Sequence, residues 1–391
     1  MRIGILTYWT SNNNYGQILQ CYALQKFLRL QGHEAFLIRY LPHNIKISLF
    51  QKIKRNLSVK KLLYRFSPQK KRDKELAAFE HSLYLRNVEL DKIRKFDDFK
   101  NNYINASQKV YNSMGELRQN PPEADVYICG SDQVWNNSLL SPETSVWYLN
   151  FGERGIRRIA YAASIGRDIS EYEKKKFKQY LLRFNAISVR EKSSLLLCES
   201  LGIRHVQVTL DPTLLLPVEE YRKLESAPQD SGVKTYLFMY VLNVSCKDEI
   251  YWDKIKAYLS RSRLDFKIVC SSGYMQAREL VNEYANLQAT LPEWLFYIDN
   301  SSYVMTTSFH GVVFCIKMHK PFLVILLTNR YAKGNDRIIS LLEAIGLSER
   351  IFNPNLQLKM QIEKPINWEM VDENVSKLQQ KSFEFLKNNL K

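Results

Sequence analysis

The stretch YVMTTSFHGVVFCIKMHKPFLVILL, residues 303–327, decides the fold class. Its first apolar run, 303–307, predicts a short buried strand that ends at a polar loop. The run 312–318 predicts a helix, and the run 321–327 predicts another buried strand. Short apolar strands separated by helices are typical of parallel sheets that are covered on both faces. The stretch therefore predicts an α/β protein.

The same alternation extends along the chain, and it predicts two domains. Further strand-like runs lie at 2–8, 34–40, 125–129, 157–166, 186–194, 206–216, 235–242 and 266–272. Because 391 residues are long for a single core, we expect two domains, and Asp211-Pro212 marks a natural boundary between them. We assign 1–210 to an N-terminal Rossmann-like domain and 211–391 to a C-terminal Rossmann-like domain that ends in a helix. The expected fold is two facing parallel-sheet domains with a cleft between them.

Composition indicates an ordinary globular protein of a reducing compartment. Apolar residues make up 45% and charged residues 25% of the chain. The six cysteines are scattered and form no CxxC pair, so neither a zinc site nor a disulfide framework is expected. The N-terminus lacks a signal-peptide core, and no run reaches the roughly 18 apolar residues of a spanning helix. We therefore expect a cytoplasmic protein that holds no metal.

The net charge of +16 is concentrated in one segment. Residues 46–74 contain eleven Lys or Arg against one acid, Asp73. Within this insertion, 58–66 predicts an amphipathic helix with an apolar stripe beside lysines, which suits an anionic membrane surface. The alternative is that the stripe packs on the protein and the lysines form a solvated face. Nucleic acid is not expected, because no nucleic-acid-binding motif accompanies the charge.

Ligands of such sheets bind beyond the carboxyl ends of the strands, so the loops there are candidate sites. Asn14, Tyr15 and Gly16 follow the first strand, where a glycine before a helix can bring backbone amides to an anion. A plain turn is the alternative. Ser131 and Asp132 follow the strand 125–129 and form a compact polar pair. Asp132 could accept a proton, orient a hydroxyl, or only cap the next helix.

Two further loops carry stronger chemistry. Arg190 ends the run 186–189, and its fork of donors matches carboxylate and phosphate oxygens. An ion pair with Glu191 or another acid is the alternative for this arginine. His310 lies just past the strand 303–307, where the topology predicts the mouth of a cleft. Histidine there can act as a general acid near neutral pH, although a lone histidine among apolar residues is more often structural.

These loops, in this order, resemble the polysaccharide pyruvyl transferase family. The matching segments span almost the whole chain, and GSDQVWN, SVRE and SFHG together are specific. The matching segments are NYGQILQCYALQ (14–25), YICGSDQVWN (127–136), YAASIG (161–166), ISVREKSS (187–194), LDPTLL (210–215), TTSFHGVVF (306–314), KPF (320–322) and RIISLLEAIGL (337–347).

The resemblance implies a GT-B-like fold and a reaction. Family members move a pyruvyl group from phosphoenolpyruvate onto two hydroxyls of a sugar, leaving a cyclic ketal. By resemblance, His310 is the catalytic histidine and Arg190 a donor-binding arginine, with Ser308 and Gly311 beside them on the donor side. From position and chemistry, we assign Asp132 as a base or hydroxyl orienter. The acceptor side is expected in the N-terminal domain, at Asn14, Tyr15, Gly16 and Ser131.

One position departs from the family pattern. Pyruvyl-transferring members place an arginine two residues before the histidine, and this chain has Ser308 there. Serine cannot neutralise a carboxylate, so another cation must compensate or the donor must differ. The candidates are Arg167, Arg330 and Arg337.

The expected function is therefore transfer of a pyruvyl group to a bacterial surface polysaccharide or its lipid-linked precursor. Phosphoenolpyruvate is the expected donor substrate, no other cofactor is expected, and the partners are a glycan acceptor and the inner face of an anionic plasma membrane. A GT-B glycosyltransferase that uses a nucleotide sugar is the first alternative. A non-catalytic glycan-binding module is the second. The acceptor sugar and the oligomeric state do not follow from the sequence.

Overall fold

The computed structural model describes residues 1–11, 13–42, 88–136, 142–229, 235–244, 246–271, 287–328 and 331–391, with the single positions 82, 85 and 139. Two of the sequence-based expectations concern residues that the structure does not describe. The basic insertion 46–74, with its predicted amphipathic helix, and Arg330 lie outside the described residues.

Six parallel strands form the first sheet, in the order β2-β1-β3-β4-β5-β6. They are β1 (Arg2–Leu6), β2 (Glu34–Leu37), β3 (Val126–Cys129), β4 (Arg157–Ala163), β5 (Ala186–Val189) and β6 (Val206–Val208). All four residues of the central strand β3 are buried, as expected for a parallel strand covered on both faces.

Four parallel strands form the second sheet, in the order β10-β9-β7-β8. They are β7 (Tyr236–Val241), β8 (Asp265–Cys270), β9 (Tyr303–Thr306) and β10 (Phe322–Val324). The stretch 303–327 supplies β9, the helix α13 and β10, so its predicted strand–helix–strand order is confirmed. The predicted α/β fold with two parallel sheets is confirmed as well.

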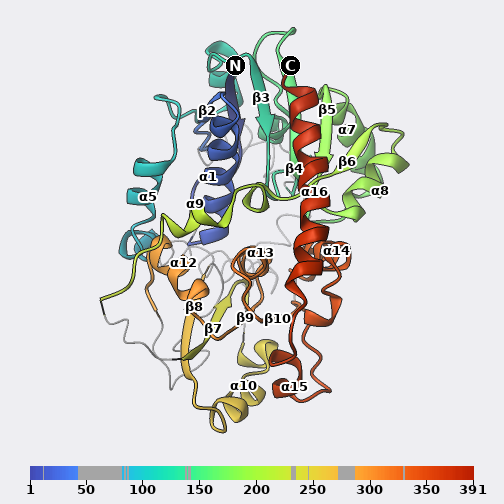
Figure 1. Cartoon of the computed structure of the whole chain (residues 1–391). Coiled ribbons are helices and arrows are strands. Elements are labelled where there is room, and N and C mark those ends of the chain that lie inside the picture. The colour runs from blue at the N-terminus through green and yellow to red at the C-terminus, as the bar shows by residue number, and fades with distance from the viewer. Residues whose placement is uncertain are drawn as a thin grey trace, which may run out of the picture.

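Helices cover both sheets, and the two halves lie one beyond the other along the molecule (Figure 1). The described α-helices are α1 (Tyr15–Leu30), α5 (Phe96–Tyr103), α6 (Met114–Gln119), α7 (Glu171–Leu181), α8 (Lys192–Ser200), α9 (Val218–Arg222), α10 (Trp252–Leu259), α12 (Leu291–Asp299), α13 (Phe309–Lys317), α14 (Asp336–Ile345), α15 (Leu358–Ile362) and α16 (Trp368–Asn389).

The C-terminal helix α16 runs alongside both halves (Figure 1). Ser382 Oγ accepts a hydrogen bond from the backbone N–H of Leu210 at 3.0 Å, and Arg157 of β4 donates to the carbonyl of Asn389 at 2.8 Å. α16 lies in the segment 211–391, which we assign to the second domain, and these two hydrogen bonds join it to the first half.

The halves also meet at the start of α1, where Tyr15 enters the second half. Its ring stacks on Trp294 with centroids 5.3 Å apart, and its hydroxyl donates to the carbonyl of Ala289 at 2.5 Å. Burial raises the pKa of the Tyr15 hydroxyl far above its usual range. This contact holds the α1 N-terminus, and the loop before it, against the second sheet.

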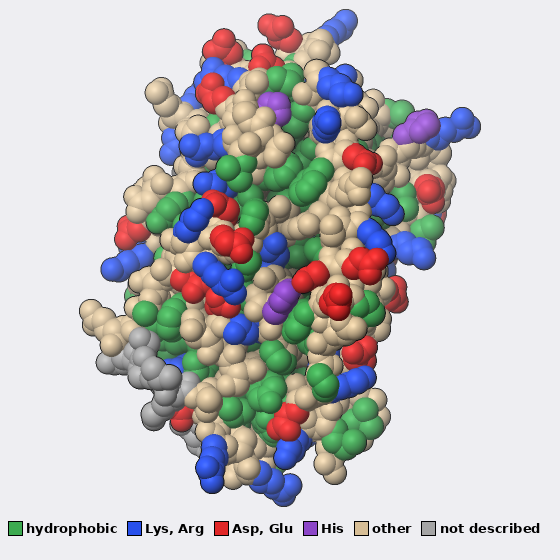
Figure 2. Space-filling model, in the orientation of Figure 1, with side chains coloured by type: hydrophobic (Ala, Val, Ile, Leu, Met, Phe, Trp, Pro, Cys, Tyr) green, Lys and Arg blue, Asp and Glu red, His purple; other side chains and the backbone are tan. Residues whose placement is uncertain are grey.

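On the face seen in Figure 2, Lys and Arg side chains are interspersed with Asp and Glu. Within the described parts of the chain, no helix is both long enough and apolar enough to cross a membrane.

Candidate functional site

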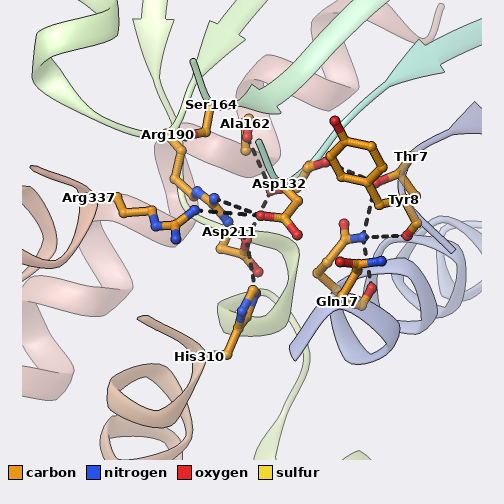
Figure 3. Close-up of polar contacts among 12 residues, drawn as sticks. Thr7, Tyr8, Gln17, Asp132, Ala162, Ser164, Arg190, Asp211, His310 and Arg337 are labelled. Carbon is orange, nitrogen blue, oxygen red and sulfur yellow. Dashed lines mark hydrogen bonds and ion pairs between the residues drawn. The ribbon is translucent and has the colours of Figure 1, made fainter. Parts of the chain in front are cut away.

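Loops that follow strands of both sheets converge on one buried cluster (Figure 3). Asp132 follows β3, Arg190 follows β5 and Asp211 follows β6. His310 and Arg337 come from the second half, in the first turns of α13 and α14. Three residues expected at strand ends, Asp132, Arg190 and His310, are therefore brought together.

Arg190 lies at the centre of the cluster, and its side chain is 2% exposed. Its Nη1 donates to Asp211 Oδ2 at 2.7 Å, and its Nη2 donates to Asp132 Oδ1 at 3.1 Å. Burial alone would lower the pKa of the guanidinium, but the two carboxylates outweigh burial and raise it. The ion pair proposed as the alternative for Arg190 is present, with Asp132 and Asp211 as the partners.

Asp132 is ionised although it is buried. Burial by itself would raise its pKa, but Arg190, His310 and Arg337 outweigh burial and lower it. The residue has a φ of 73°, a left-handed conformation that asparagine and aspartate tolerate better than most residues. The carboxylate is therefore held in its basic form between two arginines.

Asp211 is the site residue that sequence reasoning missed, because it was taken only as the boundary residue before Pro212. Besides Arg190, its Oδ2 accepts from Ser131 Oγ at 2.9 Å. Its Oδ1 accepts from the backbone N–H and the hydroxyl of Thr213 at 3.1 and 2.6 Å. His310 and Arg190 outweigh burial and hold the pKa of this carboxyl well below its usual range. The sequence signal that could have identified Asp211 is its position: it is a carboxylate after β6, at the same sheet edge as Asp132 and Arg190.

His310 faces Asp211 from the second half. Its Nε2 lies 3.7 Å from Asp211 Oδ2, is buried, and has no hydrogen-bond partner among the described residues. The other side of the ring packs on the backbone of Gly16, where an added Cβ would lie 2.2 Å from both Cγ and Nδ1 of the imidazole. Gly16 thus lets the start of α1 approach the histidine closely.

Ser308 and Gly311, which are close to His310 in sequence, make contacts with neighbouring residues. Ser308 is the N-cap of α13, and its Oγ accepts from the N–H of Gly311 at 3.4 Å. An added Cβ on Gly311 would lie 2.3 Å from Oγ1 of Thr306, so the glycine is required for close packing on β9. Both residues, predicted on the donor side, are buried and shape the loop that presents His310.

Of the three cations proposed to compensate for Ser308, the structure brings Arg337 to the cluster. Its Nη1 lies 3.7 Å from Asp132 Oδ1, and its guanidinium lies over the ring of Phe309 at 5.8 Å. Arg190 lies over the same ring at 4.6 Å. Burial, followed by repulsion from Arg190, lowers the pKa of Arg337. An anionic ligand would relieve that repulsion.

Arg167 is placed differently. Its two terminal nitrogens donate to the two carboxylate oxygens of Glu173 at 2.9 and 2.8 Å. This bidentate pair lowers the pKa of Glu173 to about 2, mainly through the hydrogen bond from Arg167. Arg167 is therefore less suited than Arg337 to neutralise a ligand, and Arg330 lies outside the described residues.

The residues predicted for the acceptor are mostly enclosed. Tyr15 and Ser131 are 0% exposed, and Gly16 is covered by the His310 ring. Asn14 is the N-cap of α1 and accepts from the N–H of Gln17 at 3.4 Å. The structure gives these residues roles in packing and capping.

Openings adjoin the cluster between the two halves. Two cavities of about 240 and 390 Å³ are both lined by Gln133, Arg167 and Arg337, and Phe309 also lines the larger one. Arg337 and Phe309 are therefore the cluster members that face a cavity. Over the described parts of the chain, no group of three or more His, Cys, Asp or Glu side chains could hold a metal ion.

Two parallel-sheet halves, with a buried histidine, two carboxylates and two arginines where their loops meet, define a two-lobed α/β protein with a candidate active site between the halves. The chain belongs to the polysaccharide pyruvyl transferase family, whose model matches residues 14–329. It is thus a transferase, and the resemblance seen in the sequence is confirmed.

Three solved structures show a distant likeness over nearly the whole chain. An alpha-glucosyltransferase in complex with UDP and DNA has a TM-score of 0.47 and 11% identity, covering 99% of this chain and 95% of its own. MnaA of S. aureus with UDP has a TM-score of 0.47 and 10% identity, covering 100% and 97%. The UDP-GlcNAc 2-epimerase of Neisseria meningitidis has a TM-score of 0.46 and 11% identity, covering 99% and 100%. No curated protein matches the sequence.

Proposed function

We propose that this protein transfers a pyruvyl group from phosphoenolpyruvate to two hydroxyls of a sugar in a bacterial surface polysaccharide or its lipid-linked precursor. Family membership supports a pyruvyl transferase acting on a polysaccharide. The observation that carries the donor assignment is the buried His310, 3.7 Å from Asp211 and beside the arginine pair. This arrangement supplies a proton donor and cationic groups in one place.

The chemistry gives each group a task. Protonation of the methylene carbon of phosphoenolpyruvate makes its C2 carbon cationic, and a sugar hydroxyl attacks that carbon. Phosphate then leaves, the second hydroxyl closes the ring, and both hydroxyl protons are released. Protonation needs a positioned acid, and His310 fills this role, with the carboxylate of Asp211 3.7 Å from its Nε2. One of the two released protons replaces the one that His310 gives, and the other leaves with the phosphate.

The two arginines bind the donor unequally. Arg190 is already neutralised by Asp132 and Asp211, so it fixes the geometry of the site. Arg337 has a more distant carboxylate partner and borders both cavities, so it meets the carboxylate or phosphate of the donor. In this proposal Arg337 supplies the charge that Ser308 lacks.

Asp132 serves the acceptor. Its low pKa keeps the carboxylate ionised, and it neighbours Gln133, which lines both cavities. An ionised carboxylate there accepts the proton of the attacking hydroxyl or orients that hydroxyl. The acid and the base of the reaction are then separate residues, His310 and Asp132.

A lipid-linked acceptor fits a peripheral position on the cytoplasmic face of the plasma membrane. The support is the charge of the insertion 46–74, since a Lys or Arg near an anionic surface contributes about 1 kcal/mol. Pelleting with vesicles of anionic or neutral lipid tests this. Binding that depends on lipid charge and weakens with salt is expected, and binding indifferent to both contradicts it.

The direct test of the function supplies phosphoenolpyruvate and a lipid-linked oligosaccharide fraction from the source organism. Release of phosphate and appearance of a pyruvate ketal on the glycan are expected with the wild type. His310→Ala should lower this rate by roughly a hundred- to ten-thousand-fold while the fold survives. Transfer of a sugar from a nucleotide donor, with phosphoenolpyruvate left intact, would show that the chain is a glycosyltransferase instead.

A further inference from the structure

The larger cavity between the halves has the size and position of a ligand site. Its volume is about 390 Å³, within the range of roughly 300–1,000 Å³ typical of small-molecule pockets. Gln133 and Asn136 line it from the loop after β3, and Phe309, Tyr331 and Lys333 line it from the second half. We call it the amide-lined cavity.

Two carboxamides of this cavity are available to a ligand. The side chains of Gln133 and Asn136 are half-buried and make no hydrogen bond with any other described residue. The wall residue Asn335 differs, since its side chain bonds both backbone groups of Leu327, at 3.1 and 2.8 Å. A carboxamide both donates and accepts hydrogen bonds, which is also true of each hydroxyl of a sugar.

The available amide of Gln133 is held next to the candidate donor cation. An added Cβ on Gly166 would lie 2.1 Å from Gln133 Nε2, so the amide rests on the bare backbone of that glycine. From the position of an added Cβ on Gly334, Arg337 Nη2 is 3.6 Å away and Gln133 Nε2 is 4.0 Å away. The guanidinium and the amide therefore border the same small space.

The rest of the lining suits a neutral ring with polar edges. Phe309 and Tyr331 contribute aromatic side chains, which offer apolar surface to the C–H face of a sugar. Lys333 is engaged by Asp168 and Asp336, at 3.2 and 3.4 Å, so its charge is already balanced. The cavity thus offers hydrogen-bonding amides and aromatic surface, with Arg337 as its cation nearest the reaction cluster.

We propose that the amide-lined cavity binds the sugar ring of the acceptor and that Gln133 and Asn136 hydrogen-bond its hydroxyls. That the bound sugar is the acceptor rests on the proposed function, whereas the binding of a sugar in this cavity does not. In this position a bound hydroxyl lies near Arg337, whose Nη1 is 3.7 Å from Asp132 Oδ1. The cavity replaces Asn14, Tyr15, Gly16 and Ser131 as the place where the acceptor enters.

Binding can be measured without turnover by saturation-transfer difference NMR. The probes are the methyl pyranosides of glucose, galactose, mannose, N-acetylglucosamine and N-acetylmannosamine, each with and without phosphoenolpyruvate. The first variant is the double substitution Gln133→Ala with Asn136→Ala. The second is Gly334→Leu, which fills the cavity from a position whose added Cβ makes only ordinary contacts. The control is Asn102→Ala, because Asn102 lines a separate cavity of about 250 Å³.

We expect at least one glycoside to give a signal with the wild type and with Asn102→Ala. Both cavity variants should weaken that signal at least tenfold at an unchanged melting temperature. No signal from any glycoside with the wild type, or equal signals from the folded cavity variants, would overturn the assignment. If the cavity variants lose sugar binding but the wild type never consumes phosphoenolpyruvate, the cavity assignment stands and the proposed reaction fails.

Discussion

Nε2 of His310 lies 3.7 Å from Oδ2 of Asp211, and the two residues come from different halves of the molecule. The carboxylate side chain is 0% exposed, and that of the histidine is 7% exposed. The proton donor of the proposed reaction is therefore complete only when the halves are apposed as they are here. Contacts that hold the halves together, such as that of Tyr15 with Ala289, also maintain this pair.

Asp211→Asn removes the charge opposite His310 and keeps the shape of the side chain. Because His310 loses the carboxylate opposite its Nε2, we expect phosphate release to slow by roughly a hundredfold, within the range for acid–base groups. The substitution also removes one partner of a buried ion pair. Because Arg190 keeps its hydrogen bond to Asp132, the free energy of unfolding should fall by at most about 3–5 kcal/mol. The pH–rate profile of the folded variant decides the role. An alkaline limb that stays in place would show that Asp211 is only structural.

Gly16→Ala should disturb the histidine without touching the substrate. The new methyl group would overlap the imidazole at 2.2 Å, so the ring must leave its present position opposite Asp211. We expect at least a tenfold fall in kcat. Gly115→Ala in α6 is the matched control, because its Cβ would meet only Ser113 Oγ at 3.6 Å. Similar activity in the two variants would show that the His310 geometry has no influence on the rate.

Arg190→Lys tests the fork of donors at the centre of the cluster. Arg190 reaches Asp132 and Asp211 with different nitrogens, which a single ammonium cannot reproduce. We expect the affinity for phosphoenolpyruvate to fall at least fivefold and the melting temperature to drop. Calorimetric titration and thermal unfolding of the purified variant measure both. Unchanged affinity would remove Arg190 from the donor site.

Glu225, which lies outside the site, makes the stability of the protein depend on pH. Burial, and then the charge of Asp299, raise its pKa to about 7. The folded state binds this proton more tightly than the unfolded chain, so the group's contribution is present below its ordinary pKa of 4.5 and is lost as the pH rises through about 7. Glu225→Gln should therefore stabilise the protein at pH 8 by roughly 1 kcal/mol, after allowance for solvent screening of this half-buried group.

Calorimetric melting at pH 5 and pH 8 checks this expectation. The gain from Glu225→Gln should shrink toward pH 5, where the native carboxyl is already protonated. The exposed Glu199→Gln is the control, and its melting temperature should follow the wild type at both pH values. A gain of the same size at both pH values would contradict the assignment of a raised pKa.

Sequence patterns located the strands because a parallel strand covered on both faces must be apolar throughout, as β3 and β7 are. The strand-end rule then brought Asp132, Arg190 and His310 together correctly. Asp211 was missed because the following proline made it look like a boundary. Tyr15 was misplaced because its burial depends on Trp294 and Ala289, which are far away in sequence and only meet it in the folded protein.

The charge balance of the cluster was also beyond sequence reasoning. A pattern shows an arginine, but only the fold shows which carboxylate neutralises it. Arg167 and Arg337 were equivalent candidates in the sequence. They separate once Glu173 is seen to hold Arg167 with two hydrogen bonds, while Arg337 stands over Phe309 beside a cavity.

The donor assignment is tested most directly by isothermal titration of the wild type and Arg337→Gln with phosphoenolpyruvate and with UDP-N-acetylglucosamine. Our account predicts that the wild type binds phosphoenolpyruvate, that Arg337→Gln weakens this binding at least tenfold at an unchanged melting temperature, and that the nucleotide sugar does not bind. Binding of the nucleotide sugar without binding of phosphoenolpyruvate would contradict it.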